Sequence, residues 1–453
     1  MQWGSAGVRG APPPVGSCIL CRVAVHTIEE AASALGEGAA APLILMLANG
    51  TQPASLPLSP PAELGRRIQA GGQTHEVSDE RMSRDHAVVS WDNGGWRIRD
   101  LDSRNGTYVD GERITGETRR EGDAILRLGH TLFALLADGR GHPAPEGEHV
   151  IGPEVARAYE QIRRHASDDL LLLYGEPGSG KEAAARLYHA SGPRAGGPFV
   201  AVNCAAIPDG VAERLLFGAK KGAFSGAIEA SGHFQMASGG TLFLDEVADL
   251  DAGVQARLLR YVETREVVPL GATTGAPIAL GIVAASHREL RVAVKEHRFR
   301  EDLFHHLTRQ TVSLPPLRER RVDVVRLVQR ELAAAGPVLP HPRLLEACCL
   351  RPWPGNIREL RAAVRRAAAI AIAEQREQVR PDDLDPIAGK AVTLTGETAV
   401  DRPLPLAELD KDAVIQALAR ANGVVSVASR ILGVHRTQLY RLMAKHGIAR
   451  DDI

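Results

Sequence analysis

The sequence predicts a multidomain protein in which an all-β sandwich, an α/β domain and a small helical domain follow one another. Between residues 42 and 137, short apolar or alternating runs such as "HAVVSW" and "TLFALLA" are separated by Gly, Asn and Asp, as in a β-sandwich. Between residues 150 and 320, helical stretches alternate with buried strands such as "LLLLYG" and "TLFLDE", which is typical of a parallel sheet covered by helices. The end of the chain reads as short helices, and 453 residues fit about three domains.

The domain boundaries follow from changes in composition and periodicity. Residues 1–41 have weak periodicity and stay unassigned. We predict the sandwich at 42–137, a linker at 138–149, the α/β part at 150–320, a helical part at 321–385, a second linker at 386–404 and three short helices at 405–453.

The composition is that of an ordinary globular protein. The net charge is −1, so any basic surface must be local. We find no apolar run of membrane-spanning length and no signal-peptide pattern, so no membrane contact is expected. The five cysteines are scattered and odd in number, which favours a reducing, cytoplasmic compartment. Cys18 and Cys21 are spaced as a metal or redox pair, but we interpret them as small apolar residues on a strand.

The stretch "LLLLYGEPGSGKE" predicts a phosphate-binding loop between a buried strand and a helix. Gly175, Gly178 and Gly180 let backbone amides surround a polyphosphate, and Lys181 supplies a charge for it. Glu182 stands where a Ser or Thr usually follows this lysine; the alternative is a plain glycine-rich turn. The expected ATP contacts are Gly175, Glu176, Pro177, Gly178, Ser179, Gly180, Lys181 and Glu182.

A second strand, "GGTLFLDE", ends in two acids. Asp245 is expected to hold Mg²⁺ and Glu246 to polarise the attacking water. Two acids at the end of a strand are often a solvated turn, but beside a glycine loop they indicate a nucleotide site.

Donors suited to a phosphate monoester lie in loops of the predicted sandwich. These are Arg66, Ser83, Arg84 and Asn105. The alternative reading is that Asn105-Gly106 is a hairpin turn and that the arginines are merely solvated. Because Arg67 directly follows Arg66, the sequence leaves open which of the two binds the phosphate.

The last predicted helices carry a local excess of positive charge. Residues 426–450 contain five Lys or Arg and no Asp or Glu, and Gly433 separates two short helices as in a helix-turn-helix. The second helix would present Arg436, Thr437, Gln438 and Arg441 to DNA. A packing domain with a solvated basic face is the alternative.

Residues 150–385 resemble the AAA+ domain of sigma-54-dependent transcriptional activators. The matching segments are "GEPGSGKE", "FVAVNCAAI", "LFGAKKGAFSGA", "GGTLFLDEV", "FREDL", "LPPLRER" and "WPGNIREL". The resemblance implies ATP hydrolysis in a ring, typically a hexamer, that remodels the sigma-54 RNA polymerase closed complex. It gives the sigma-54 contact to Gly222, Ala223, Phe224, Ser225, Gly226 and Ala227.

The same resemblance assigns roles around the nucleotide. It implies that Asn203 links Glu246 to the sigma-54 loop, that Arg358 is a lid arginine and that Arg300 is an arginine finger on the neighbouring subunit. Two positions depart from the family. His306 replaces an arginine and His287 replaces the sensor asparagine, so we expect slower hydrolysis than in relatives.

The two ends of the chain resemble a forkhead-associated (FHA) domain and a Fis-type DNA-binding domain. The first implies a phosphothreonine protein or a Ser/Thr kinase as partner, and the second implies upstream enhancer DNA. We therefore predict a sigma-54-dependent activator driven by ATP and Mg²⁺. The alternative is a hydrolysis-impaired, DNA-bound adaptor that binds nucleotide and phosphoprotein; an unrelated AAA+ chaperone is disfavoured.

Overall fold

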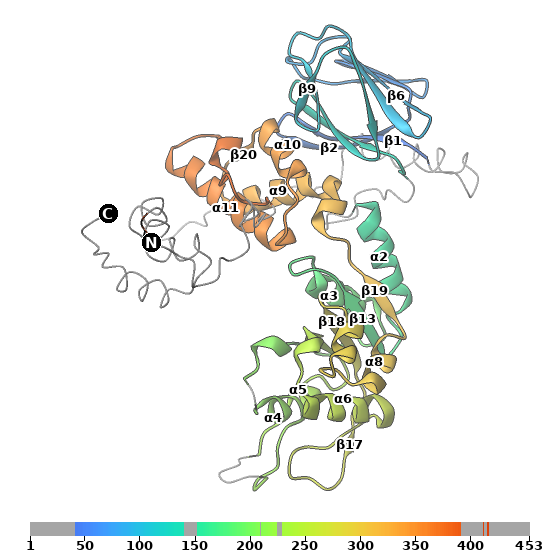
Figure 1. Cartoon of the computed structure of the whole chain (residues 1–453), viewed down its shortest axis with the longest axis vertical. Coiled ribbons are helices and arrows are strands. Elements are labelled where there is room, and N and C mark those ends of the chain that lie inside the picture. The colour runs from blue at the N-terminus through green and yellow to red at the C-terminus, as the bar shows by residue number, and fades with distance from the viewer. Residues whose placement is uncertain are drawn as a thin grey trace, which may run out of the picture. The chain divides into compact units, whose positions relative to one another are not determined.

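The computed structural model describes residues 41–139, 152–208, 210–223 and 229–390, together with Lys411 and Ile415, which are helical (Figure 1). Two compact units divide the chain after Lys390. The predictions for Cys18, Cys21, Phe224–Ala227 and the helix-turn-helix residues Arg436, Thr437, Gln438 and Arg441 lie outside the described residues.

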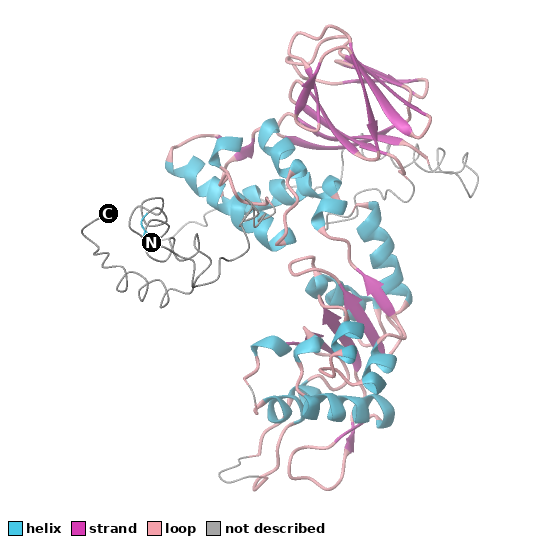
Figure 2. Ribbon diagram, viewed as in Figure 1, coloured by secondary structure: helices cyan, strands magenta, loops and turns pink. Residues whose placement is uncertain are grey.

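Two six-stranded sheets form the N-terminal sandwich. Its strands are magenta in Figure 2. The first sheet has the order β2(Gln52–Leu58), β1(Leu43–Asn49), β12(Thr131–Leu136), β11(Ala124–Leu128), β8(Thr107–Val109) and β9(Glu112–Ile114). The second has the order β10(Glu117–Glu121), β7(Gly95–Asp100), β6(Ala87–Asp92), β3(Ala62–Leu64), β4(Arg67–Ala70) and β5(Gln73–Glu76). Trp96, Ile98 and Phe133 lie in the core between the sheets, because the strands place alternate residues inward.

A five-stranded parallel sheet forms the centre of the α/β domain. Its order is β14(Phe199–Asn203), β15(Thr241–Asp245), β18(Gly281–Ser286), β13(Leu170–Tyr174) and β19(Thr311–Ser313). The helices are α2(Pro153–Arg164), α3(Lys181–Ser191), α4(Ala212–Phe217), α5(His233–Met236), α6(Ala252–Thr264), α7(Leu290–Lys295) and α8(Glu301–Leu307), with a short hairpin of β16(Glu266–Val267) and β17(Ala276–Pro277). Short 3-10 turns follow two strands, η1(Cys204–Ala206) after β14 and η2(Val247–Asp249) after β15. Because all five strands run parallel, their carboxyl ends meet at one edge, where the predicted site residues follow β13, β15 and β18.

A helical domain follows the sheet. It contains η3(Leu317–Glu319), α9(Arg321–Ala335), α10(Pro342–Leu350) and α11(Asn356–Ala373), and it closes with η4(Pro381–Asp383) and the parallel pair β20(Leu339–Pro340) and β21(Gln378–Val379). Trp353 is fully buried between α10 and α11, and its Nε1 donates to the Cys348 carbonyl at 2.7 Å. The predicted β-sandwich, parallel α/β sheet and helical part after it are therefore confirmed, whereas the short helices predicted at 405–453 lie outside the described residues apart from Lys411 and Ile415.

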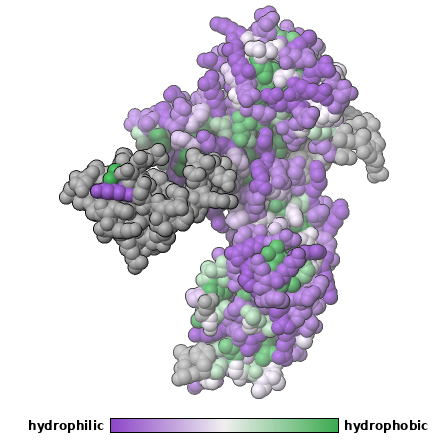
Figure 3. Space-filling model, in the orientation of Figure 1, coloured by the Kyte–Doolittle hydropathy of each residue, from purple (hydrophilic) through white to green (hydrophobic). Residues whose placement is uncertain are grey.

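The surface of the described chain is mainly hydrophilic on the face that Figure 3 shows. Among the described residues, no helix is both long and apolar enough to span a bilayer. Cys204, Cys348 and Cys349 are buried free thiols.

Candidate functional site

The glycine loop joins β13 to α3 in a conformation that requires its glycines. Gly178 and Gly180 have φ values of 75° and 107°, in the left-handed region that side chains disfavour. A Cβ on Gly178 would lie 2.4 Å from the Gly355 carbonyl oxygen, so the loop is also closely covered by the segment before α11. Glycine therefore stands where the backbone adopts a left-handed conformation and where the segment before α11 packs closely against it.

Two side chains of this loop fit a bound polyphosphate. Lys181 is 6% exposed, and its Nζ lies 3.1 Å from the Gly175 carbonyl oxygen and 3.3 Å from Glu246 Oε1. The Ser179 hydroxyl is buried and has no hydrogen-bond partner in the protein. An unpaired buried hydroxyl is costly unless it contacts a ligand, and the Lys181 ammonium held beside it carries positive charge, so these residues fit a nucleotide phosphate.

The two acids follow β15 as predicted. Asp245 Oδ1 is buried without a partner, and burial raises the pKa of this carboxyl despite the opposing charge of Lys181. A single carboxylate beside nucleotide phosphates is an arrangement that Mg²⁺ accepts, and no larger ligand cluster is present in the described chain. Asp245 would hold the metal, which would supply positive charge to the phosphates.

Glu246 is held at the end of β15 in a left-handed conformation, with φ of 57°. Burial opposes ionisation of its carboxyl, but hydrogen bonds from His287 and the charge of Lys181 outweigh this effect and lower its pKa. An ionised carboxylate in this place can accept a proton from water.

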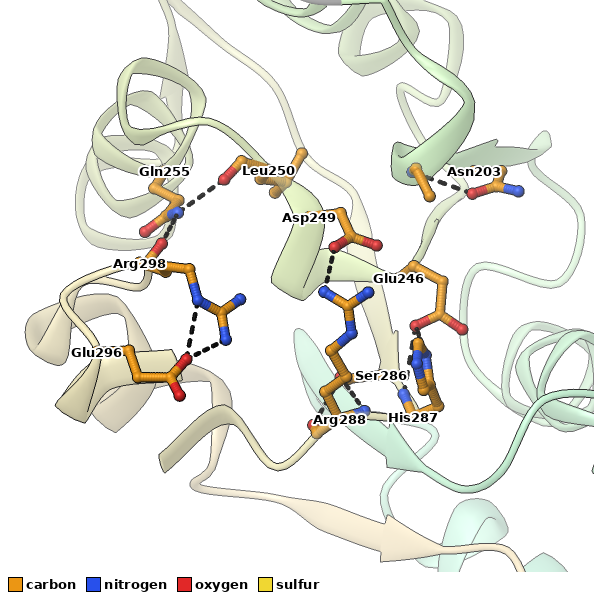
Figure 4. A network of polar contacts seen from close by, with 11 residues as sticks. Asn203, Glu246, Asp249, Leu250, Gln255, Ser286, His287, Arg288, Glu296 and Arg298 are labelled. Carbon is orange, nitrogen blue, oxygen red and sulfur yellow. Dashed lines mark hydrogen bonds and ion pairs between the residues drawn. The ribbon is translucent and has the colours of Figure 1, made fainter. Parts of the chain in front are cut away.

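His287 is the unexpected partner of Glu246 (Figure 4). Its Nδ1 lies 2.5 Å from Glu246 Oε2, and its backbone N–H donates to the same oxygen at 3.3 Å. Because an ionised carboxylate only accepts, Nδ1 must carry the proton. Asn203 faces Asp245 in the neighbouring strand, and its Oδ1 accepts from the Ala205 N–H at 3.1 Å. His287 therefore occupies the hydrogen-bonding role toward Glu246 that the resemblance gave to Asn203.

The residues on either side of His287 hold its backbone in place. Ser286 Oγ donates to the Arg288 carbonyl at 2.8 Å, and Arg288 reaches Asp249 at 2.8 Å (Figure 4). Asp249 belongs to η2, directly after Glu246. The ends of β15 and β18 are thus joined by the Arg288–Asp249 pair as well as by the Glu246–His287 contact.

The helical domain contacts the glycine loop directly. Asn356 Nδ2 donates to Glu176 Oε2 at 3.0 Å and to the Pro177 carbonyl at 3.1 Å. Arg318 binds the same Glu176 at 2.8 Å, and Arg320 donates to the Ser179 carbonyl at 2.6 Å. These residues hold the glycine loop against the segments around η3 and the start of α11.

The sandwich places its predicted donors near one another at the ends of its strands. The Arg66 N–H donates to the Ser83 carbonyl at 3.0 Å, and Ser83 Oγ accepts from the Arg104 N–H at 3.2 Å. Asn105 Nδ2 donates to the Arg81 carbonyl at 2.7 Å. Arg66 and Arg84 are exposed, as a docking site for a phosphorylated partner requires.

His86 fixes this loop from within the sandwich. Its Nδ1 accepts from the Ser83 N–H at 3.0 Å, and its Nε2 lies 3.3 Å from the Gly106 carbonyl. Burial lowers the pKa of His86, so the neutral ring holds both loops together. Arg67 instead lies on β4, 3.8 Å from Glu76.

Comparison with known proteins places these sites in a family. Residues 150–313 match the sigma-54 interaction domain, 318–397 the AAA+ ATPase lid domain, 63–129 the FHA domain and 405–446 the bacterial regulatory protein, Fis family. FlbD of Caulobacter vibrioides is 38% identical over 62% of this chain and 68% of its own length. NtrC of Escherichia coli K12 is 37% identical over 67% of this chain and 70% of its own.

The chain belongs to the family of sigma-54-dependent transcriptional regulators. It covers 64% of the related ZraR of Klebsiella oxytoca and 58% of the Nif-specific regulatory protein of Azotobacter vinelandii, so it spans less than two thirds of these relatives. The crystal structure of NtrX from Brucella abortus resembles it with a TM-score of 0.51 at 29% identity, over 66% of this chain and 69% of that one. The NtrX complex with ATP gives 0.50 at 30% identity, over 67% and 70%.

Within this sigma-54 regulator, Arg358 lies beside the glycine loop, since a Cβ on Gly178 would be 3.1 Å from the Arg358 Cβ, whereas Arg300, His306 and Glu182 contact other side chains. Arg358 is exposed on α11, and its charge acts to lower the pKa of Asp245. Arg300 is exposed at the start of α8 and binds Asp302 at 3.0 and 2.7 Å. His306, also on α8, has its Nε2 3.7 Å from Glu263 Oε1. Glu182 points to Arg186 at 2.8 Å.

The base of the predicted sigma-54 loop is held by backbone contacts with Ala230 and with Leu270, which lies between β16 and β17. Ala219 pairs with Ala230, and the Lys220 N–H donates to the Leu270 carbonyl at 2.9 Å. Gly222 has φ of 83°. The loop therefore leaves the regulator's α/β domain from a fixed base, and its residues beyond Ala223 lie outside the described residues up to Ile228.

Sequence reasoning missed the contacts that need the tertiary fold. Arg318 and Arg320 stand in "LPPLRER" and Asn356 in "WPGNIREL", segments that carried the resemblance without a role for these residues. The sequence places His287 where the family has its sensor asparagine, but it does not indicate the contact of His287 with Glu246. The signal available was a polar residue directly after a buried strand beside the glycine loop.

Proposed function

We propose that this chain is an ATP-driven activator of sigma-54 RNA polymerase. ATP and Mg²⁺ bind at the loop of residues 175–182, and hydrolysis in a ring moves the loop of residues 222–227 against sigma-54. The observation that carries the proposal is the pair of unpaired, buried groups, Ser179 Oγ and Asp245 Oδ1, at the glycine loop of a sigma-54 interaction domain. Such groups gain a partner when a phosphate and its metal bind.

The chemistry follows from the positions of the chain's own residues. Lys181 and the loop amides hold the phosphates, Asp245 would hold Mg²⁺, and Glu246 orients and deprotonates the attacking water. Arg358 would reach the phosphates from the lid, and Arg300 would act on the nucleotide of the next subunit. Because Arg300 is exposed on α8, a head-to-tail ring, typically a hexamer, would complete each site.

The two remaining domains would determine where on the DNA the protein acts and which signal it receives. The Fis-type segment would bind upstream enhancer DNA with Arg436, Thr437, Gln438 and Arg441, in the cytoplasm where the polymerase works. The FHA sandwich would bind a phosphothreonine protein or a Ser/Thr kinase through its exposed arginines, Arg66 and Arg84, and through Ser83 and Asn105.

A second candidate is a DNA-bound adaptor that binds nucleotide and hydrolyses it poorly. The short His287–Glu246 contact favours it, because a stabilised carboxylate is a weaker base, and His306 replaces an arginine. His306→Arg tests this candidate: a variant as slow as the wild type removes His306 as the cause of slow turnover.

Open-complex formation tests the activator proposal. We expect the full chain with ATP to melt a sigma-54 promoter that carries its upstream site, and Lys181→Ala to leave it closed. Wild-type protein that hydrolyses ATP without opening the promoter would contradict the activator role. Wild-type protein that binds ATP without hydrolysing it would support the adaptor.

A further inference from the structure

The first sheet of the FHA sandwich is buried on both faces. In β12, Phe133 and Leu135 lie in the core between the sheets, whereas Leu132, Ala134 and Leu136 belong to a second core. The same division holds in β11, where Leu126 lies inside the sandwich and Ile125 in the second core. An antiparallel sheet with one solvated face would alternate apolar and polar residues, so these continuous apolar runs require a partner on the outer face.

The AAA+ lid is that partner. The second core joins this outer face to Val325, Val328 and Leu332 of α9 and to Leu345, Cys348 and Cys349 of α10. α9 packs against β1 and β2, as Figure 1 also shows, and α10 packs against β11 and β12. A Cβ on Gly111, in the turn between β8 and β9, would lie 2.9 Å from the Leu350 side chain.

One buried ion pair crosses this contact. Arg127 of β11 donates to Glu346 of α10 at 2.6 Å, and both residues are 6% exposed. The Arg127 guanidinium also lies over the Tyr108 ring, 3.9 Å from its centroid. Removing either charge leaves the other buried and unpaired, so the pair fixes one register of sheet against helix.

Hydrogen bonds connect the end of β11 to the recognition loop, which is the loop that carries Ser83 and Arg84. Asp79 accepts hydrogen bonds from the His130 N–H at 2.7 Å and from Thr131 Oγ1 at 2.9 Å, in the turn that follows β11. It also accepts from the Arg81 N–H at 2.9 Å, and the Arg81 carbonyl holds Asn105. The loop that carries Ser83 and Arg84 and the turn next to Arg127 therefore move together.

The lid continues this chain of contacts to the nucleotide. The Cys348 carbonyl at the end of α10 accepts from Trp353 Nε1, and the Ile357 N–H after Trp353 donates to the Gly178 carbonyl at 3.1 Å. Asn356 binds Glu176 and Pro177 of the glycine loop. Each step from Asp79 to Gly178 is a hydrogen bond, an ion pair or a single helix.

We propose that the FHA sandwich docks on the AAA+ lid through the outer face of its first sheet, and that the Arg127–Glu346 pair couples phosphothreonine-protein binding to nucleotide binding. The inference rests on the proposed function of the two sites. Coupling between two binding sites is reciprocal, so nucleotide must alter the recognition loop as phosphoprotein alters the nucleotide site. ADP alone is therefore a sufficient probe.

Hydrogen exchange of the full chain with and without ADP tests the coupling. In the wild type we expect ADP to slow exchange at residues 175–181 and also at 127–131 and 79–86. Arg127→Glu and Glu346→Arg should each keep the response at 175–181 and lose the distant one. The double swap should restore it, and Arg97→Glu, which breaks an exposed pair with Asp92 on the second sheet, should leave it unchanged.

The possible failures are distinguishable. Without protection at 175–181 in the wild type, the proposed nucleotide site fails and the inference fails with it. Protection at 175–181 with unchanged exchange at 127–131 and 79–86 overturns the coupling alone, as does a distant response that survives either single swap. Slow exchange in β6 and β7 shows that a variant is folded. Where a swap unfolds the sandwich, Arg127→Met keeps the apolar stem, and an unchanged distant response in that variant overturns the coupling.

Discussion

The molecule holds two candidate phosphate sites, and they are built in opposite ways. In the sandwich, Arg66 and Arg84 are exposed, and the backbone around them is held by Ser83, His86 and Asn105. At the glycine loop, Lys181 and Ser179 are buried and the lid covers them. Exposed cations suit reversible recognition because water and salt screen them, whereas buried charges act strongly on a reacting group. The difference supports the proposal that the first site binds a phosphorylated partner and that the second hydrolyses ATP.

The largest effect is expected from a substitution in the buried nucleotide site. Lys181→Ala should lower the ATP hydrolysis rate by about 10²–10³-fold, because a preorganised charge on the transferring phosphate is lost. Steady-state phosphate release measures it. Lys295→Ala, on the exposed side of α7, serves as the control and should leave the rate unchanged. A Lys181→Ala rate equal to the wild type would place the reacting phosphate elsewhere.

The exposed site should respond less strongly. Arg66→Ala should weaken binding of a phosphothreonine peptide roughly 10–100-fold, since a hydrogen bond to a charged group is worth about 1.5–3 kcal/mol. Calorimetric titration with phosphorylated and unphosphorylated peptide measures this loss. The matched control is Arg67→Ala, which removes only the contact with Glu76. Equal losses in both variants would show that the phosphate does not bind at Arg66.

His287 sharpens the account of the buried site. His287→Ala should raise kcat by about threefold, because Glu246 loses a hydrogen bond that lowers its pKa and becomes a stronger base. KM for ATP should stay constant, and His305→Ala, exposed on α8, should change neither value. A lower kcat in His287→Ala would instead mean that His287 orients Glu246 for attack.

The smallest effect concerns the acid that supports the buried loop. Burial raises the pKa of Asp323 to about 7 despite the charge of Arg320, which binds the Ser179 carbonyl. The folded state then keeps a proton that the unfolded state has lost, so stability falls as the pH rises from 3.8 to about 7. Asp323→Asn should therefore weaken the fall in stability with rising pH. The expected change in Tm across this pH range is a few degrees, at about 2–4 °C per kcal/mol.

Thermal unfolding at several pH values checks the slope. Glu121→Gln, exposed at the end of β10, is the control and should keep the wild-type dependence. An Asp323→Asn slope as steep as that of the wild type would assign the pH dependence to other groups.

Much of this comparison was predictable from the sequence. The glycine loop, the two acids after β15 and the loop arginines of the sandwich follow from local spacing, because phosphate contacts use backbone turns and strand ends. The contacts of Asn356, Arg318 and Arg320 were not predictable, since they join segments about 140–180 residues apart that only the fold brings together. The run "TLFALLA" predicted a strand of the sandwich, but its burial on both faces and the lid as its partner came only from the structure.

Mixing two inactive variants tests the central claim most directly, namely that this chain hydrolyses ATP in a ring whose sites are shared between neighbours. Glu246→Gln removes the base of its own site, and Arg300→Ala removes the finger that it lends to the next. An active interface needs Glu246 from one subunit and Arg300 from its neighbour. Each variant alone should be inactive, and in an equal mixture about a quarter of the interfaces should have both residues and be active. Activity of the mixture equal to the sum of the two separate variants would contradict the shared site.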